Sequence, residues 1–152
     1  MLKYVNMKSR LTKIIFWLLV VVFILVIIEM LVPAVRELFA GSFAFFLLFL
    51  AFFILGIALI LSTLKEKVGG KLKKFLLLTG GSAVGVLASI ILHNVIYGLF
   101  IWGFGADFWE RVGLGDEPVF FILGLIVLPI GFLVGVIGSI VLSCKSKKEA
   151  IK

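Results

Sequence analysis

The sequence predicts an all-α integral membrane protein with four transmembrane helices, both termini in the cytoplasm and no soluble domain. The first observation is composition: of 152 residues, 63% are hydrophobic and only 15% are charged, and the mean hydropathy is +1.32. Soluble domains are about 45–50% apolar and about 25% charged, and a fold of roughly 150 residues still exposes about 30% of its unfolded surface. The composition therefore excludes a soluble enzyme, a disordered chain and a nucleic-acid-binding protein.

The second observation is a set of four apolar runs, each longer than the roughly 20 residues that cross about 30 Å of hydrocarbon. They predict spans at approximately residues 11–33, 40–64, 75–98 and 118–143. The third run is too long for one straight span, so its helix is expected to end near Tyr97 and Gly98. Residues 99–117 then form an outer loop with an interfacial segment. The runs do not alternate polar and apolar residues, as the strands of a barrel do.

The third observation is the sorting of charge. Of the 15 basic residues, 13 fall in the N-terminal segment, the link between the second and third spans, and the C-terminal segment. Because basic residues are retained in the cytoplasm, these segments and both termini are expected there. Lys71, Lys73 and Lys74 directly precede the third span. They are expected to contact anionic lipid headgroups, which attract each cation by about 1 kcal/mol.

The first two spans carry few polar residues. The first span has a basic leading segment, but its apolar core, residues 14–28, is at the upper end of signal-peptide length, and no small-x-small cleavage pattern follows. The first span is therefore expected to be retained. The second span has seven phenylalanines toward its outer half, which are expected to face lipid: Phe39, Phe43, Phe45, Phe46, Phe49, Phe52 and Phe53.

Small residues are expected to pack the third span against the fourth, because close backbone approach is what holds helices together in lipid. In the third span Gly81, Gly85 and Ser89 recur every four residues. Four glycines of the fourth span fall within about 60° on a helical wheel of about 100° per residue: Gly124, Gly131, Gly135 and Gly138. The alternative for these glycines is a hinge or a pore-lining face. Pro129 lies roughly opposite them and is expected to kink the helix.

Ionisable residues inside a membrane are costly and are candidates for function. Here they are Glu29 and His93, which the spans place at comparable heights in the outer leaflet. Polar residues nearby complete a candidate cluster of Glu29, His93, Asn94, Tyr97, Asp116 and Glu117. The cluster either binds a cation or relays a proton, or its members satisfy one another, with Glu29 paired to His93 or reaching toward Arg36. Asp116 is also expected to cap the fourth helix.

The sequence contains no nucleophile–base constellation, phosphate-binding loop or Cys/His cluster. It therefore predicts no catalytic residue, no metal site and no cofactor, and the protein is not expected to be an enzyme. Cys144, the one cysteine, cannot form an intrachain disulfide. It is either a small apolar residue near the membrane interface or a site of lipid attachment.

The second half of the chain carries four motifs in order. They are LHNVIYGL at residues 92–99, GDEPVFFI at 115–122, PIGFLVG at 129–135, and the pair Gly138-Ser139. Residues 72–142 thereby resemble a group of small prokaryotic membrane proteins of unknown function. The resemblance implies a multi-span inner-membrane protein and carries no functional residue across.

These observations predict a small, non-catalytic protein of the prokaryotic cytoplasmic membrane. It is expected to act through helix packing or by association with a membrane complex. Its expected partners are the lipid bilayer and either a second copy of itself or a membrane complex, and not nucleic acid. The alternative is a small transporter or channel subunit that uses the polar site near the outer surface.

Overall fold

The structure, a computed structural model, describes residues 10–39, 43–66 and 68–149. The described residues form helices and no strands: α1 (Arg10–Leu31), α2 (Pro33–Phe39), α3 (Phe43–Lys65), α4 (Gly70–Phe104), α5 (Phe108–Arg111), α6 (Pro118–Ile122), η1 (Leu123–Val127) and α7 (Leu128–Glu149). Four segments are long and apolar enough to cross a membrane: Arg10–Leu31, Phe43–Lys65, Gly70–Phe104 and Pro118–Lys145. The predicted all-α fold with four membrane helices is confirmed.

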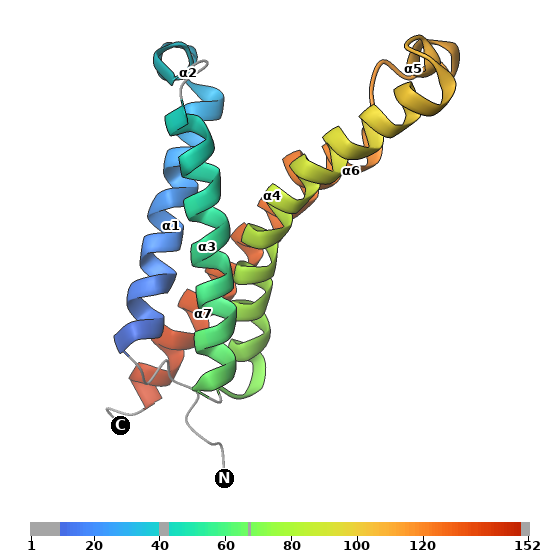
Figure 1. The fold of residues 1–152 in the computed structure, drawn as a ribbon. Helices are drawn as coiled ribbons and strands as arrows, with labels where there is room; N and C mark the ends of the chain where they lie inside the picture. Colours follow the sequence, from blue (N-terminus) through green and yellow to red (C-terminus); the bar gives the residue numbers. More distant parts are fainter. Residues whose placement is uncertain (1–9, 40–42, 67, 150–152) are drawn as a thin grey trace.

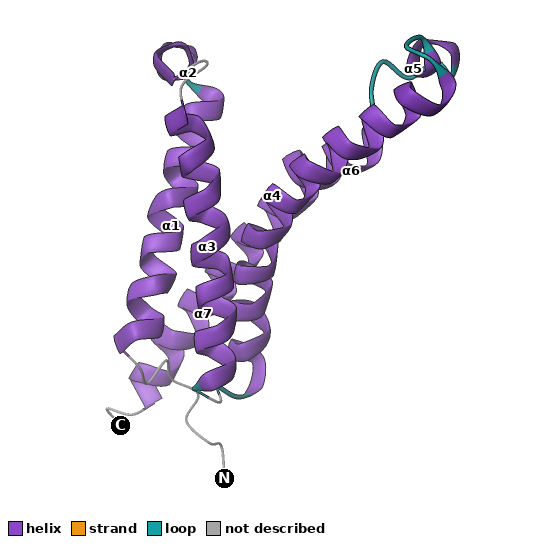
Figure 2. Cartoon of the chain, viewed as in Figure 1, coloured by secondary structure: helices purple, strands orange, loops and turns teal. Residues whose placement is uncertain are grey.

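The long helices lie together at one end of the molecule and separate into two arms at the other (Figure 1). The first arm consists of α1 and α3, and the second consists of α4 with α6, η1 and the start of α7. The closed end holds the start of α1, the end of α7 and the turn from α3 to α4. Because of its lysines, we also call the outermost part of this end the basic end. Loops in the second arm gather at its tip (Figure 2). We call the space between the two arms the fork.

α4 is the central helix of the closed end, because it packs against both α3 and α7, whereas α1 packs mainly against α3. Three phenylalanines join the remaining helices below the fork: Phe23 of α1, Phe52 of α3 and Phe132 of α7. The Phe23 and Phe132 rings stack with centroids 4.3 Å apart, and the Phe52 ring lies 5.9 Å from Phe23 and 5.2 Å from Phe132. This cluster ties the two helical pairs together where they begin to diverge.

Phe52 and Phe49 correct the expectation that the phenylalanines of this span face lipid. Their side chains are 1% and 5% exposed, because they lie on the side of α3 that packs into the bundle. Phe43, Phe45 and Phe46 are exposed as predicted, with 70%, 42% and 48% of their surfaces accessible. Phe39 has no described side chain. The helix is apolar all round, so its pattern alone does not distinguish the protein-facing side.

The glycine face of the fourth span, which runs from Gly124 in η1 to Gly138 in α7, packs against α4, as the helical spacing predicts. A Cβ atom on any of these four glycines would approach α4 to 3.0 Å or less: Gly124 faces Ser89, Gly131 faces Ser82, Gly135 faces Thr79, and Gly138 faces Phe75. Such distances leave no room for a side chain unless the facing atoms move, and at Gly135 those atoms include the α4 backbone. The absence of side chains on α7 therefore sets how closely the two helices approach.

A second close crossing joins α3 to α4 and was not predicted. A Cβ on Gly56 would lie 2.9 Å from the Gly80 carbonyl oxygen, and a Cβ on Gly80 would lie 2.9 Å from the Gly56 carbonyl oxygen. Gly81, which was predicted to pack, instead has nothing within 4 Å of such an atom. Gly85 and Ser89 do face the fourth span as predicted, at Leu128 and Gly124, whereas the glycine that meets α3 is Gly80.

Pro129 disturbs the fourth span as predicted, but through a π-helical turn. The turn, η1, covers Leu123–Val127, and the Leu128 N–H donates to the carbonyl of Leu123, five residues earlier. A proline ring collides with the carbonyl four residues before it and offers no N–H to that carbonyl. A wider turn accommodates both effects, and π turns of this kind redirect a helix.

The long helix α4 does not end at Gly98 as predicted, but continues to Phe104. One glycine costs a helix only about 1 kcal/mol, and aromatic packing beyond it favours continuation. The Phe100 ring lies 5.0 Å from Phe108 and 5.4 Å from Trp109. The helix ends where Gly105 adopts a positive φ of 101°. At about 1.5 Å per residue, α4 is longer than the hydrocarbon is thick.

Candidate functional site

The polar residues of the second arm meet where α6 begins beside α4. The His93 Nδ1 atom lies 3.1 Å from the Glu117 carbonyl oxygen and 3.3 Å from Glu117 Oε2, and its Nε2 atom lies 3.5 Å from Asp116 Oδ2. Since a carbonyl oxygen only accepts, Nδ1 is the proton donor to it. His93 thus fastens the start of α6 to the middle of α4, across 24 residues of sequence.

Glu117, and not Asp116, is the N-cap of α6. Its carboxylate accepts from the Val119 N–H at 2.8 Å and the Phe120 N–H at 3.0 Å, and its side chain is 4% exposed. Asp116 precedes the cap, and its Oδ1 accepts from the Glu117 N–H at 2.7 Å. The correction follows from Pro118, which occupies the first helical position and so places the cap at the residue directly before it.

Tyr97 and Asn94 make different contacts from those of His93. The Tyr97 ring stacks on Trp109 with centroids 5.9 Å apart and planes 6° apart, and the Trp109 indole N–H donates to the Tyr97 carbonyl at 3.3 Å. The Asn94 side chain is exposed and donates to the Ile90 carbonyl of its own helix at 2.8 Å. Tyr97 therefore belongs to the aromatic tip of the second arm, and Asn94 projects from α4.

Glu29 lies near the end of α1, in the other arm from His93 (Figure 1). Its surface is 4% exposed, and within the described residues its Oε2 atom has no hydrogen-bond partner. The predicted cluster of six residues is thus divided. His93, Asp116 and Glu117 come together, while Glu29 is enclosed in the first arm.

This geometry limits the chemistry of the second arm. Both oxygens of Glu117 are occupied by backbone N–H groups or by His93, and Asp116 is 54% exposed in its side chain. Within the described part of the chain, no group of three or more His, Cys, Asp or Glu side chains could hold a metal ion. The contacts among His93, Asp116 and Glu117 therefore hold the start of α6 against α4.

A layer of buried hydroxyls near the basic end was missed by the sequence analysis. Thr12, Thr63 and Ser143 each lie 11 residues from one of the clustered phenylalanines, and each has an enclosed Oγ without a partner in the described structure. Eleven residues are about 16 Å of helix and return to nearly the same face. The signal in the sequence was the 11-residue spacing of each hydroxyl from Phe23, Phe52 or Phe132. That spacing is informative only when the three phenylalanine rings are known to be in contact.

The predicted lipid-contacting lysines lie in the first turns of α4 at the basic end. Lys71 and Lys74 are exposed, and Lys73 is half-buried. Cys144 is exposed near the end of α7, at the same end of the molecule. These positions leave both interpretations of Cys144 open.

Comparison with models of protein families found no match to this chain, and comparisons with curated proteins and with solved structures found none either.

Proposed function

We propose that this membrane protein is non-catalytic and acts by receiving a transmembrane helix of another membrane protein in its fork. The observation that carries the proposal is a stripe on α4 that loses its partner partway along the helix. In the closed end this side of α4 packs on α3 through Gly80 and Ala83, close to Gly56. In the second arm, where α4 diverges from α3, the same side of α4 continues without α3 (Figure 1).

The uncovered stripe consists of Ile91, Asn94, Gly98 and Trp102, which all lie within about 40° of Gly80 around the helix at about 100° per residue. Ile91 is 54% exposed and Trp102 is 87% exposed. Asn94 is also exposed, and no atom lies within 4 Å of a Cβ built on Gly98. An exposed amide beside a glycine is the combination that promotes helix association in lipid, through a hydrogen bond and a close approach.

Two other small-residue faces are already used within the chain. The glycines of α7 pack on α4, and Gly56 packs on Gly80. They therefore support the monomer rather than an oligomer, which differs from the expectation that glycine faces mediate association. The Gly98 region of α4 is the small-residue surface that remains open in the second arm, and it supports docking in the fork.

We also propose that the protein lies in the cytoplasmic membrane of a prokaryote with its basic end in the cytoplasm. The start of α1, the end of α7 and the turn from α3 to α4 share this end (Figure 1). Basic residues favour the cytoplasmic side of such a membrane. The partner helix would then enter the fork from the outer leaflet.

The test is photo-crosslinking in the native membrane with a benzophenone amino acid at Ile91, within the stripe. Val134 is the matched control, because it is similarly exposed, at 49%, but lies on α7 away from the stripe. The expected result is a protein adduct of defined mass at Ile91 and not at Val134. An adduct with the mass of a dimer would show that the helix in the fork belongs to a second copy of this chain and not to another protein. Lipid adducts alone at both positions would refute docking in the fork.

Two substitutions test the contacts themselves. Asn94→Leu and Gly98→Leu are expected to leave the monomer intact, because the hydrogen bond of the exposed Asn94 side chain is to its own helix and no described atom lies within 4 Å of a Cβ built on Gly98. Each is expected to weaken binding of the partner helix by roughly 1–2 kcal/mol, the contribution of a polar contact between membrane helices. Less of the partner should then co-purify. Unchanged co-purification with both variants would exclude the stripe as the contact surface.

A further inference from the structure

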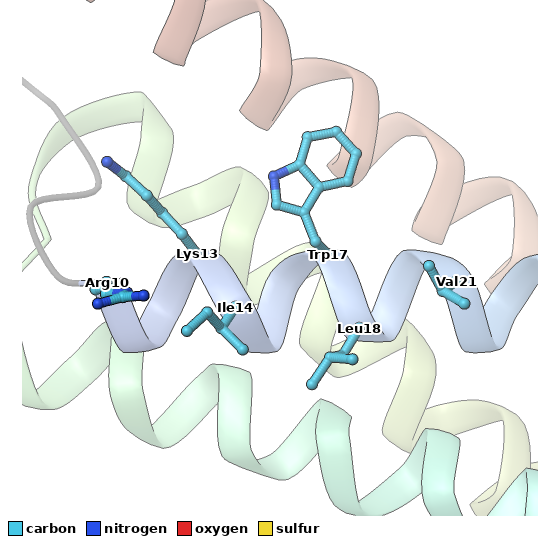
Figure 3. Close-up of a pocket in the computed structure, with 6 residues that line it drawn as sticks. All are labelled: Arg10, Lys13, Ile14, Trp17, Leu18 and Val21. Atoms are coloured by element: carbon cyan, nitrogen blue, oxygen red, sulfur yellow. The ribbon is translucent and has the colours of Figure 1, made fainter.

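A groove of about 330 Å³ runs along the exposed side of α1 near the basic end. It is lined by residues of this one helix: Arg10, Lys13, Ile14, Trp17, Leu18 and Val21. Figure 3 shows Lys13 and Trp17 on one side of the groove and Ile14 and Leu18 on the other. We call it the α1 groove.

The α1 groove lies between two ridges of side chains. Residues four apart in a helix form ridges, so Arg10, Ile14 and Leu18 make one ridge, while Lys13, Trp17 and Val21 make the other. Each ridge begins with a cation and continues with apolar side chains. The wall of the groove is apolar throughout and includes the aliphatic stems of Arg10 and Lys13, whose charged groups flank it at one end.

The α1 groove faces away from the rest of the protein. Phe16 and Leu19 on the opposite side of α1 are fully buried, whereas Trp17 is 53% exposed and Val21 is 51% exposed. Val21 lies 11 positions after Arg10, or about 16 Å along the helix, which matches one leaflet of a hydrocarbon core about 30 Å thick. Trp17 lies one turn inside the cations, at the depth where tryptophan meets the headgroups.

We propose that the α1 groove binds one anionic phospholipid. Its phosphodiester lies between Arg10 and Lys13, and an acyl chain follows the groove past Trp17 to Val21. Among the described residues neither cation forms an ion pair, so both are available to the phosphate, and arginine matches phosphate oxygens with paired N–H donors. A zwitterionic headgroup would bring its own ammonium group toward these cations and bind less well.

The proposal is tested with the full chain in detergent after removal of endogenous lipid. Binding of phosphatidylglycerol, phosphatidylcholine and soluble glycerol phosphate is measured by native mass spectrometry. The expected order places phosphatidylglycerol first, with no binding of glycerol phosphate at the same concentration, because the acyl chain contributes to the site. Equal retention of both lipids, or binding of glycerol phosphate equal to that of phosphatidylglycerol, would overturn the proposal.

The variant Arg10→Gln with Lys13→Gln removes the two charges from the groove. At about 1 kcal/mol per cation, and 1.4 kcal/mol per tenfold, the affinity for phosphatidylglycerol is expected to fall about 30-fold. The matched control is Lys65→Gln with Lys145→Gln, which removes two exposed charges from the same end of the molecule but not from the groove. An equal loss in the control would show general surface attraction instead of a site.

A second readout locates the lipid without relying on affinity. Trp102→Phe with Trp109→Phe leaves Trp17 as the one tryptophan of the chain. Phosphatidylglycerol with brominated acyl chains is expected to quench Trp17 fluorescence more strongly than brominated phosphatidylcholine does. Adding the Arg10 and Lys13 substitutions should remove that difference, and a difference that persists would contradict the proposed role of the two cations.

Discussion

At the scale of single residues, Gly135 has the tightest surroundings that involve a neighbouring backbone. A Cβ at this position would lie 2.8 Å from the Thr79 backbone nitrogen and 3.0 Å from the Phe75 carbonyl oxygen. These atoms belong to α4 itself, so they cannot move away as the end of a flexible side chain can. The close approach of α4 and α7 depends on the missing side chain.

Gly135→Ala is therefore expected to destabilise the protein by about 1–3 kcal/mol, the usual cost of overpacking. Gly81→Ala is the matched control, because it lies on the same helical pair with nothing within 4 Å. Replacing a helix glycine by alanine in open space stabilises by about 0.5–1 kcal/mol, so the control should melt at the same or a higher temperature. Melting in detergent measures both, and equal effects would contradict the packing described here.

Glu29 is a second residue with a clear expected effect. Its carboxylate is enclosed in α1 with one oxygen unpartnered in the described structure, and acidic residues in the membrane cost about 2.5–3.5 kcal/mol at a helix centre. Glu29→Leu is expected to raise the melting temperature, whereas Glu37→Leu in exposed α2 should leave it unchanged. A lower melting temperature for Glu29→Leu would show that the carboxylate makes a stabilising contact.

At the scale of elements, the start of α6 depends on one side chain. Glu117 caps α6 and also contacts His93, whereas Asp116 accepts only from the Glu117 N–H and lies at 3.5 Å from His93. Glu117→Ala is expected to cost about 1 kcal/mol, as the loss of an N-cap does. Amide exchange at Val119 and Phe120 should then accelerate.

Asp116→Asn is the control for the cap, because an amide oxygen still accepts from the Glu117 N–H. It is expected to leave exchange at Val119 and Phe120 near that of the unmodified protein. Faster exchange in Asp116→Asn than in Glu117→Ala would reverse the assignment of the cap.

The elements also show where sequence patterns succeed. Long apolar runs predicted every membrane helix, because hydrocarbon leaves a backbone no partner other than its own helix. The glycine spacing on α7 predicted its packing face. The end of α4 was misplaced because packing by Phe100, Phe108 and Trp109 outweighs the weak preference of Gly98 to end a helix.

At the scale of the whole molecule, the fork is the feature that no local pattern predicted. It arises because α4 diverges from α3 in the second arm while it stays paired with η1 and α6. The division of the polar cluster follows directly. Glu29 and His93 were expected at comparable heights, but they lie in different arms, which carry them apart.

The orientation of the whole molecule is tested through Cys144, which is the one cysteine and is exposed at the basic end. A membrane-impermeant maleimide is expected to label it in inverted membrane vesicles and not in intact cells. In the control, Cys144→Ser is combined with Leu114→Cys, which places a thiol at an exposed site in the tip of the second arm. This variant should label in intact cells, and the opposite pattern would reverse the proposed orientation.

The sequence by itself determined the fold class, the four membrane helices, the clustering of charge at one end and the glycine face of α7. Each of these follows from the free energy of placing a residue in hydrocarbon, or from the regular repeat of a helix. Tertiary structure decided which side of the apolar α3 is buried, that Gly80 rather than Gly81 meets α3, and that α4 loses α3 at the fork. In a chain that is apolar on every side, hydrophobicity does not distinguish lipid from protein, so these choices rest on the shape and close contact of particular neighbours.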